Sequence, residues 1–148
     1  MPITHSAPNT IWLGGPRTVI NDLAANEVIT PGTLVERYTS SGKLRLRKHA
    51  TIGGSGTQFA ADQSALNKGV DDTYAINDLC ATLVGASGTA VWALLLSGQN
   101  VAFGAKLESA GTGALRFATT TGAQTFRTLE AVDNSAGVVN ARIRVEVE

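Results

Sequence analysis

The last nine residues of the chain, "NARIRVEVE" (140–148), alternate strictly between apolar and charged side chains. Successive side chains of a β-strand point to opposite faces of a sheet, whereas a helix repeats every 3.6 residues. The pattern therefore predicts a strand with one face in a core and the other in water. Whatever fold the chain adopts must supply a sheet to receive this strand. The apolar set is Ala141, Ile143, Val145 and Val147.

Two further segments predict β-hairpins, over 33–48 and 105–119, and they resemble each other. In the first, Gly32-x-x-Val-Glu36 is followed by Gly42-Lys-Leu-Arg45; in the second, Gly104-x-x-Leu-Glu108 is followed by Gly113-Ala-Leu-Arg116. Glycines serve the turns and alternating apolar residues face inward. We expect two cross-strand ion pairs. They are Glu36 with Arg45, and Glu108 with Arg116.

Other short strands are expected at regular spacing, with glycine-rich turns between them. The predicted segments are 79–85, 89–97 and 126–133, and a single helical turn is expected over 21–26. A chain of 148 residues suits one domain. This pattern predicts an all-β fold, a small β-barrel or β-sandwich over residues 17–148.

Residues 1–16, "MPITHSAPNTIWLGGP", contain three prolines and a Gly-Gly pair and show no period. The composition predicts an extended N-terminal arm outside the core. Its apolar residues are consecutive: Ile11, Trp12 and Leu13. They either fold back onto the domain or dock on a neighbouring protein. We expect docking on a neighbouring protein, so that deletion of residues 1–15 leaves a folded domain.

The segment 91–96 is apolar on both of its predicted faces, which is typical of a strand covered on both sides. In a small β domain the second cover is often another subunit. Three side chains of one face are therefore candidates for an oligomer interface. They are Trp92, Leu94 and Leu96.

Residue patterns that carry chemistry are missing from the sequence. One cysteine and two distant histidines offer no zinc spacing, and the aspartates between 62 and 78 lack the spacing of a calcium loop. No serine motif of a hydrolase occurs, and Cys80 lies in an apolar strand, where a buried, inert thiol is expected. We therefore predict no catalytic residue, no metal site and no cofactor.

Twelve basic and twelve acidic residues give a formal net charge of zero. The alternating Lys43, Arg45 and Arg47 are the best candidate for a nucleic-acid groove, but such grooves also need stacking aromatics and only 5% of the residues are aromatic. A solvated or neighbour-facing surface is the favoured interpretation, with no nucleic-acid partner. No apolar run of 18 residues and no signal peptide are present, so a soluble, unexported protein without a membrane partner is expected.

The order and spacing of several segments resemble the head decoration (capsid cement) proteins of tailed bacteriophages. The resemblance covers most of residues 15–148. It is carried by "GPRTVINDLAANEVITPGTLVE", "NKGVDDTYAINDL", "ALLLSGQNVAFGAKLESAGTGALR" and the "LEAVDNS…IRVEV" ending.

The resemblance implies a compact β-tulip-like barrel that binds the outer surface of a phage head as a homo-oligomer, a trimer or a dimer. Such proteins clamp neighbouring copies of the major capsid protein, are not enzymes and use no cofactor. The chain would then belong to the virion and be assembled in the host cytoplasm. From the apolar tripeptide of the arm, we further expect Ile11, Trp12 and Leu13 to contact the capsid. The alternatives are another virion β module of the tail or head–tail connector, and a sugar- or nucleic-acid-binding barrel.

Overall fold

The computed structural model of this protein describes residues 10–63, 67, 69–119 and 125–148. Within that part all regular structure is β, so the predicted all-β fold is confirmed. The strands are β1 (Trp12–Gly14), β2 (Arg17–Ala24), β3 (Leu34–Ser40), β4 (Lys43–Lys48), β5 (Gln58–Ala60), β6 (Leu79–Gly85), β7 (Ala90–Leu95), β8 (Asn100–Val101), β9 (Lys106–Ser109), β10 (Leu115–Phe117), β11 (Phe126–Thr128), β12 (Val132–Asp133) and β13 (Ala141–Val147).

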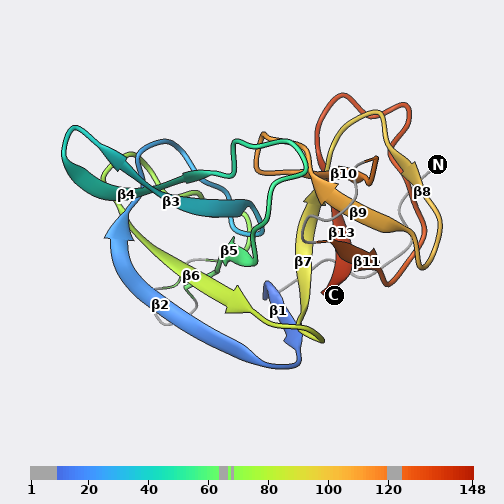
Figure 1. Cartoon of the computed structure of the whole chain (residues 1–148), viewed down its shortest axis with the longest axis horizontal. Helices are drawn as coiled ribbons and strands as arrows, with labels where there is room; N and C mark the ends of the chain where they lie inside the picture. Colours follow the sequence, from blue (N-terminus) through green and yellow to red (C-terminus); the bar gives the residue numbers. More distant parts are fainter. Residues whose placement is uncertain (1–9, 64–66, 68, 120–124) are drawn as a thin grey trace.

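Five strands close into a barrel in the C-terminal half of the chain (Figure 1). Their order is β7-β10-β9-β11-β13, and β13 returns to pair with β7. Six consecutive residue pairs join β13 to β7, from Ala141 opposite Leu95 to Glu146 opposite Ala90. The alternating last segment of the chain therefore forms a strand of the barrel wall, and the sequence predicts this strand correctly. A two-stranded ribbon of β8 and β12 is added to this half.

The N-terminal half forms a second sheet beside the barrel, with strand order β2-β6-β5-β3-β4. Its two outer strands approach each other, because a bridge joins Ala25, directly after β2, to Leu46 of β4. The guanidinium of Arg37 donates two hydrogen bonds of 3.1 Å to the carboxylate of Asp22, and so also links β3 to β2. The sheet is thus strongly curved and partly closed.

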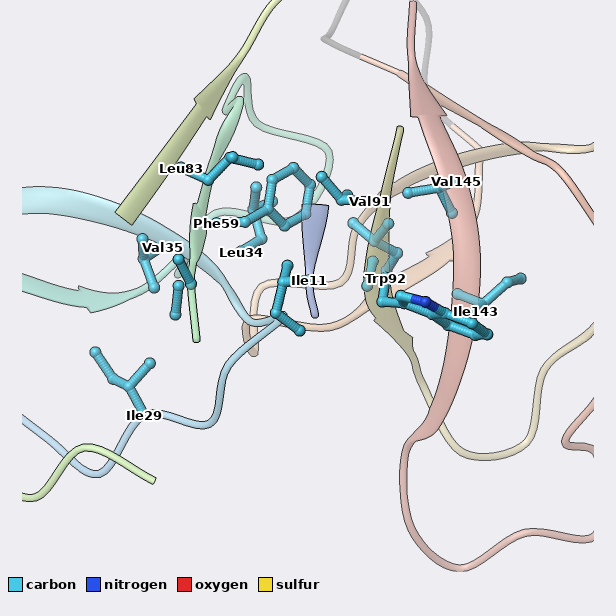
Figure 2. Packing of buried hydrophobic residues seen from close by; sticks show 14 of the residues in the cluster. Ile11, Ile29, Leu34, Val35, Phe59, Leu83, Val91, Trp92, Ile143 and Val145 are labelled. Carbon is cyan, nitrogen blue, oxygen red and sulfur yellow. The ribbon is translucent and has the colours of Figure 1, made fainter. Parts of the chain in front are cut away.

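A single apolar cluster lies between the barrel and the curved sheet (Figure 2). Phe59 of β5 meets Phe126 of β11 edge to face, with ring centroids 5.6 Å apart. Ile11, Leu34 and Val91 also belong to this cluster and are fully buried. Because both halves contribute to one core, neither half buries its apolar face without the other.

The expectation that residues 10–16 lie outside the core is wrong. Residues 12–14 form β1, which pairs with β7 beside the barrel, and Ile11 is 0% exposed at the centre of the core. The backbone N–H of Trp92 donates to the carbonyl of Ile11 over 2.8 Å. The prolines and glycines of this segment correctly predict turns. They give no indication that the segment pairs with a distant strand. Residues 1–9 of the predicted arm lie outside the described residues.

The two hairpins form, and one of their two expected ion pairs is confirmed. Glu108 lies opposite Arg116, with 2.9 Å between their charged atoms. In the first hairpin Glu36 pairs with Arg47 instead, at 2.9 Å, and Arg45 lies opposite Tyr38. The reason is the turn.

Only Ser41 and Gly42 separate β3 from β4, both with positive φ angles, whereas residues 110–114 separate β9 from β10. Aligning the sequences of the two hairpins at their turn glycines therefore gives Glu36 the wrong partner. The alignment predicts Arg45, and the true partner, Arg47, lies two residues further along β4.

Two smaller predictions are also corrected. Residues 21–24, expected in a helical turn, continue β2, because pairing with β6 overrides the capping signal of the local sequence. The strand expected over 126–133 is divided into β11 and β12, which belong to different sheets.

Candidate interaction surfaces

Strand β7 is covered on both faces, as its sequence predicts, and the chain itself supplies much of the cover. Val91, Ala93 and Leu95 are fully buried, and Trp92 on the opposite face is only 4% exposed. The guanidinium of Arg144 lies over the indole ring, 4.8 Å from its centroid. Trp92 therefore offers almost no surface to a second subunit.

Leu94 and Leu96, the other two candidates for an oligomer interface, are half-buried and keep part of their surface accessible. Leu94 lies opposite Arg142 in the register of β7 and β13. Their assignment to an oligomer interface stays a prediction.

The charged face of β13 is not fully wet, contrary to the prediction. Arg142 donates hydrogen bonds to the carbonyl oxygens of Pro31 and Val70, and lies 3.5 Å from the carboxylate of Asp71. Desolvation by burial lowers the pKa of Arg142, and the carboxylate of Asp71 opposes that effect. This side chain ties two loops of the N-terminal half to the barrel wall.

The three predicted capsid-contact residues lie in different environments. Ile11 is in the core and cannot reach a partner in this fold. Trp12 is half-buried, and the guanidinium of Arg17 stacks on its ring at 4.1 Å from the centroid. Leu13 is 41% exposed. Trp12 and Leu13 therefore remain candidates for a contact with the capsid, and Ile11 does not.

Four apolar side chains of the barrel half are exposed or half-buried on segments that hydrogen bonds join, and the local sequence predicts only one of them. We call Leu96, Phe117, Val138 and Val139 the barrel-end patch. Phe117 is 54% exposed, Val138 92% and Val139 71%. The segments that carry them belong to the barrel half of the chain (Figure 1). The signal in the sequence is the pair Val138-Val139, two apolar residues directly before the predicted last strand (140–148) and outside any predicted core face.

Two amide side chains hold the segments of the barrel-end patch together. Asn134 donates from its Nδ2 to the carbonyl oxygens of Val139, over 3.0 Å, and of Leu96, over 3.4 Å. The Oε1 of Gln99 accepts a 2.9 Å hydrogen bond from the backbone N–H of Phe117. The backbone N–H of Asn134 donates to the carbonyl of Gln99 over 2.8 Å. The patch is therefore presented by loops that are anchored to one another.

Two of the three alternating cations of strand β4, Arg45 and Arg47, bond within the chain. Arg47 pairs with Glu36, and its guanidinium lies over the ring of Tyr38 at 4.4 Å from the centroid. Arg45 donates a 2.7 Å hydrogen bond to the side-chain carbonyl of Asn77. Only Arg47 is paired with an opposite charge, and the solvated or neighbour-facing interpretation of this strand stays a prediction.

A buried serine and histidine come together where the two hairpins meet. His49 Nε2 is 2.9 Å from the carbonyl oxygen of Ser55, which can only accept, so this nitrogen carries the proton. Nδ1 then accepts from the hydroxyl of Ser109 over 2.8 Å. Ser109 is 0% exposed, so no substrate reaches its hydroxyl in this fold. The pair connects the end of β4 to the second hairpin.

Among the residues that the structure describes, no three His, Cys, Asp or Glu side chains lie close enough together to hold a metal ion. Three of the four aspartates between residues 62 and 78 accept hydrogen bonds from backbone N–H groups instead. Asp72 accepts from the N–H of Gly69, Asp78 from that of Ala75, and Asp62 from that of Ile11. Asp62 thus helps hold the N-terminal segment against the core.

Cys80 is fully buried in β6, as predicted for an inert thiol. Desolvation raises the pKa of its thiol to about 12, so the reactive thiolate is strongly disfavoured at neutral pH. We expect no labelling of the native protein by a disulfide reagent at pH 8, and stoichiometric labelling in denaturant. Absorbance of the released thiol checks this. Rapid labelling without denaturant would show that β6 opens from the sheet.

Searches against protein-family models and among curated proteins find no match to this chain. In the described ranges, the structure contains no helix long and apolar enough to cross a membrane.

Proposed function

We propose that this protein is a structural component of a phage virion that binds the outer surface of the head and stabilises it by clamping neighbouring major capsid proteins. The observation that carries the proposal is the barrel-end patch on a closed barrel. Apolar side chains left exposed on a folded protein often mark a site where another protein binds. The resemblance of residues 15–148 to head decoration proteins supports the choice of partner.

The physical demands of this role agree with the molecule. A cement protein binds a repeating surface through buried area, so it needs a stable body with an accessible apolar contact and no catalytic pocket. The barrel wall is continuous, and the patch rests on loops braced by Gln99 and Asn134. The patch replaces Ile11 as a capsid-contact candidate, beside Trp12 and Leu13.

The direct test adds the purified protein to heads of its phage that were assembled without this chain. Electron microscopy of the sedimented particles is expected to show extra density spread over the faces of the head. Density confined to one vertex or to the tail would favour the connector or tail alternative. Heads that sediment without the protein would contradict both.

A double substitution tests the assigned surface. Val138→Asp with Val139→Asp places two charges on the barrel-end patch, where they must be desolvated on docking, so we expect about a tenfold or larger loss of affinity for heads. The matched control, Val28→Asp with Ile76→Asp, adds the same charges to exposed positions of the N-terminal half. Equal binding by the two variants, measured by co-sedimentation, would show that the patch is not the contact.

A further inference from the structure

Strand β2 leaves one of its edges open. Within the described part of the chain, β2 pairs with β6 alone and borders the five-stranded sheet (Figure 1). Its C-terminal end approaches β4 through the bridge between Ala25 and Leu46, so that end is covered. Its N-terminal half has no such cover, and Arg17, Thr18 and Val19 are exposed.

The hydrogen bonds of β6 show which backbone groups of β2 point outward. Ala61 donates to the carbonyl of Ala81, and Gly85 donates to that of Thr57, so the odd-numbered residues of β6 bond toward β5. In an antiparallel ladder the alternate residues then bond to β2. These are Thr82 and Val84, which lie opposite Ile20 and Thr18.

It follows that the backbone N–H and C=O groups of Arg17 and Val19 point away from β6. They lie on the edge that no described strand occupies, where an added strand can bond to them. Three consecutive β-branched residues, Thr18, Val19 and Ile20, favour the extended conformation that strand addition needs. The ladder stays regular until the irregularity between Ile20 and Leu23, and the devices that usually protect an edge, a proline or a bulge, do not interrupt residues 17–20.

We propose that this open edge pairs antiparallel with the same edge of a second copy of the chain, across a two-fold axis at Val19. In that register Val19 faces Val19 of the other copy, and Arg17 faces the uncharged Asn21. Like charges therefore do not lie directly across from each other, and the outward N–H and C=O groups of each Val19 meet those of the other copy, so the edge is complementary to itself, as a two-fold interface requires. This interface deepens the proposed self-association of the virion protein and rests on it.

The test compares two substitutions at one position. Val19→Pro removes the outward N–H, which the pairing with β6 does not use, and proline is tolerated on an edge strand. Val19→Thr keeps the N–H and the branched shape. By light scattering we expect the parent and Val19→Thr at twice the chain mass, and Val19→Pro at the mass of one chain with an unchanged far-UV circular dichroism spectrum. A monomeric parent, or a folded Val19→Pro that keeps the parent's mass, would overturn the proposal.

Hydrogen exchange gives a second measurement on the unmodified protein, in case Val19→Pro does not fold. The amide of Val19 is expected to exchange at least about tenfold more slowly in concentrated than in dilute solution, as buried ladder amides do. Equal exchange at both concentrations would overturn the proposal. Both measurements are made without heads, so this interface can fail while head binding stands, and the reverse.

Discussion

Deletion of residues 1–15 is expected to abolish the cooperative unfolding transition of this protein. The deletion removes Ile11 from the centre of the core and β1 from its pairing with β7. It also removes the backbone N–H that satisfies the carboxylate of Asp62 and the carbonyl that accepts from Trp92. A large core side chain and several backbone pairs together approach the whole stability of an ordinary domain. Thermal unfolding followed by circular dichroism measures the result.

Two point substitutions within the same segment separate packing from loss of chain. Ile11→Ala leaves a cavity where barrel and sheet meet, and is expected to lower the free energy of unfolding by about 3 kcal/mol. Leu13→Ala truncates a side chain that is 41% exposed, and is expected to cost about 1 kcal/mol or less. A truncated protein that unfolds at the parent's midpoint would show that Ile11 is dispensable and that the segment is a true arm.

The arm illustrates what local sequence can and cannot predict here. The alternation of 140–148 and of the hairpins predicts strands because period two is a property of neighbouring residues. Strand β1 spans three residues, and Trp12 pairs with Val91, almost eighty positions away. No periodicity is visible in three residues, so a segment with prolines and glycines is interpreted as an arm even when Ile11 within it completes the core.

The candidate surfaces, too, can be predicted only where the signal lies in neighbouring residues. Apolarity on both faces of 91–96 correctly predicts that β7 is covered, but it cannot say that Arg144 of the same chain covers Trp92. This pattern predicts Leu96 as a surface candidate. It does not predict Val138 and Val139, because their exposure depends on a loop fixed by Asn134, and hydrogen bonds between distant loops leave no periodic signal in the sequence.

The second large effect is expected at the ion pair of the second hairpin. Arg116→Met is expected to lower the free energy of unfolding by about 3 kcal/mol, because it leaves the carboxylate of Glu108 buried without its cation. The Glu108 side chain is only 1% exposed, while that of Arg116 is 28% exposed, so water replaces the guanidinium only in part. The low end of the range for a broken buried pair is therefore appropriate. Denaturant unfolding measures the difference.

The first hairpin supplies the matched control for this substitution. Arg47→Met breaks the corresponding pair, but there the side chains of Arg47 and Glu36 are 38% and 25% exposed, so the expected loss is about 1 kcal/mol, including the contact with Tyr38. Glu108→Gln combined with Arg116→Met removes the stranded charge and should recover part of the stability lost in Arg116→Met. Equal losses for Arg116→Met and Arg47→Met would mean that burial of Glu108 does not set the cost. The two hairpins carry the same Glu–Arg pair, and its depth in the fold decides how much each pair matters.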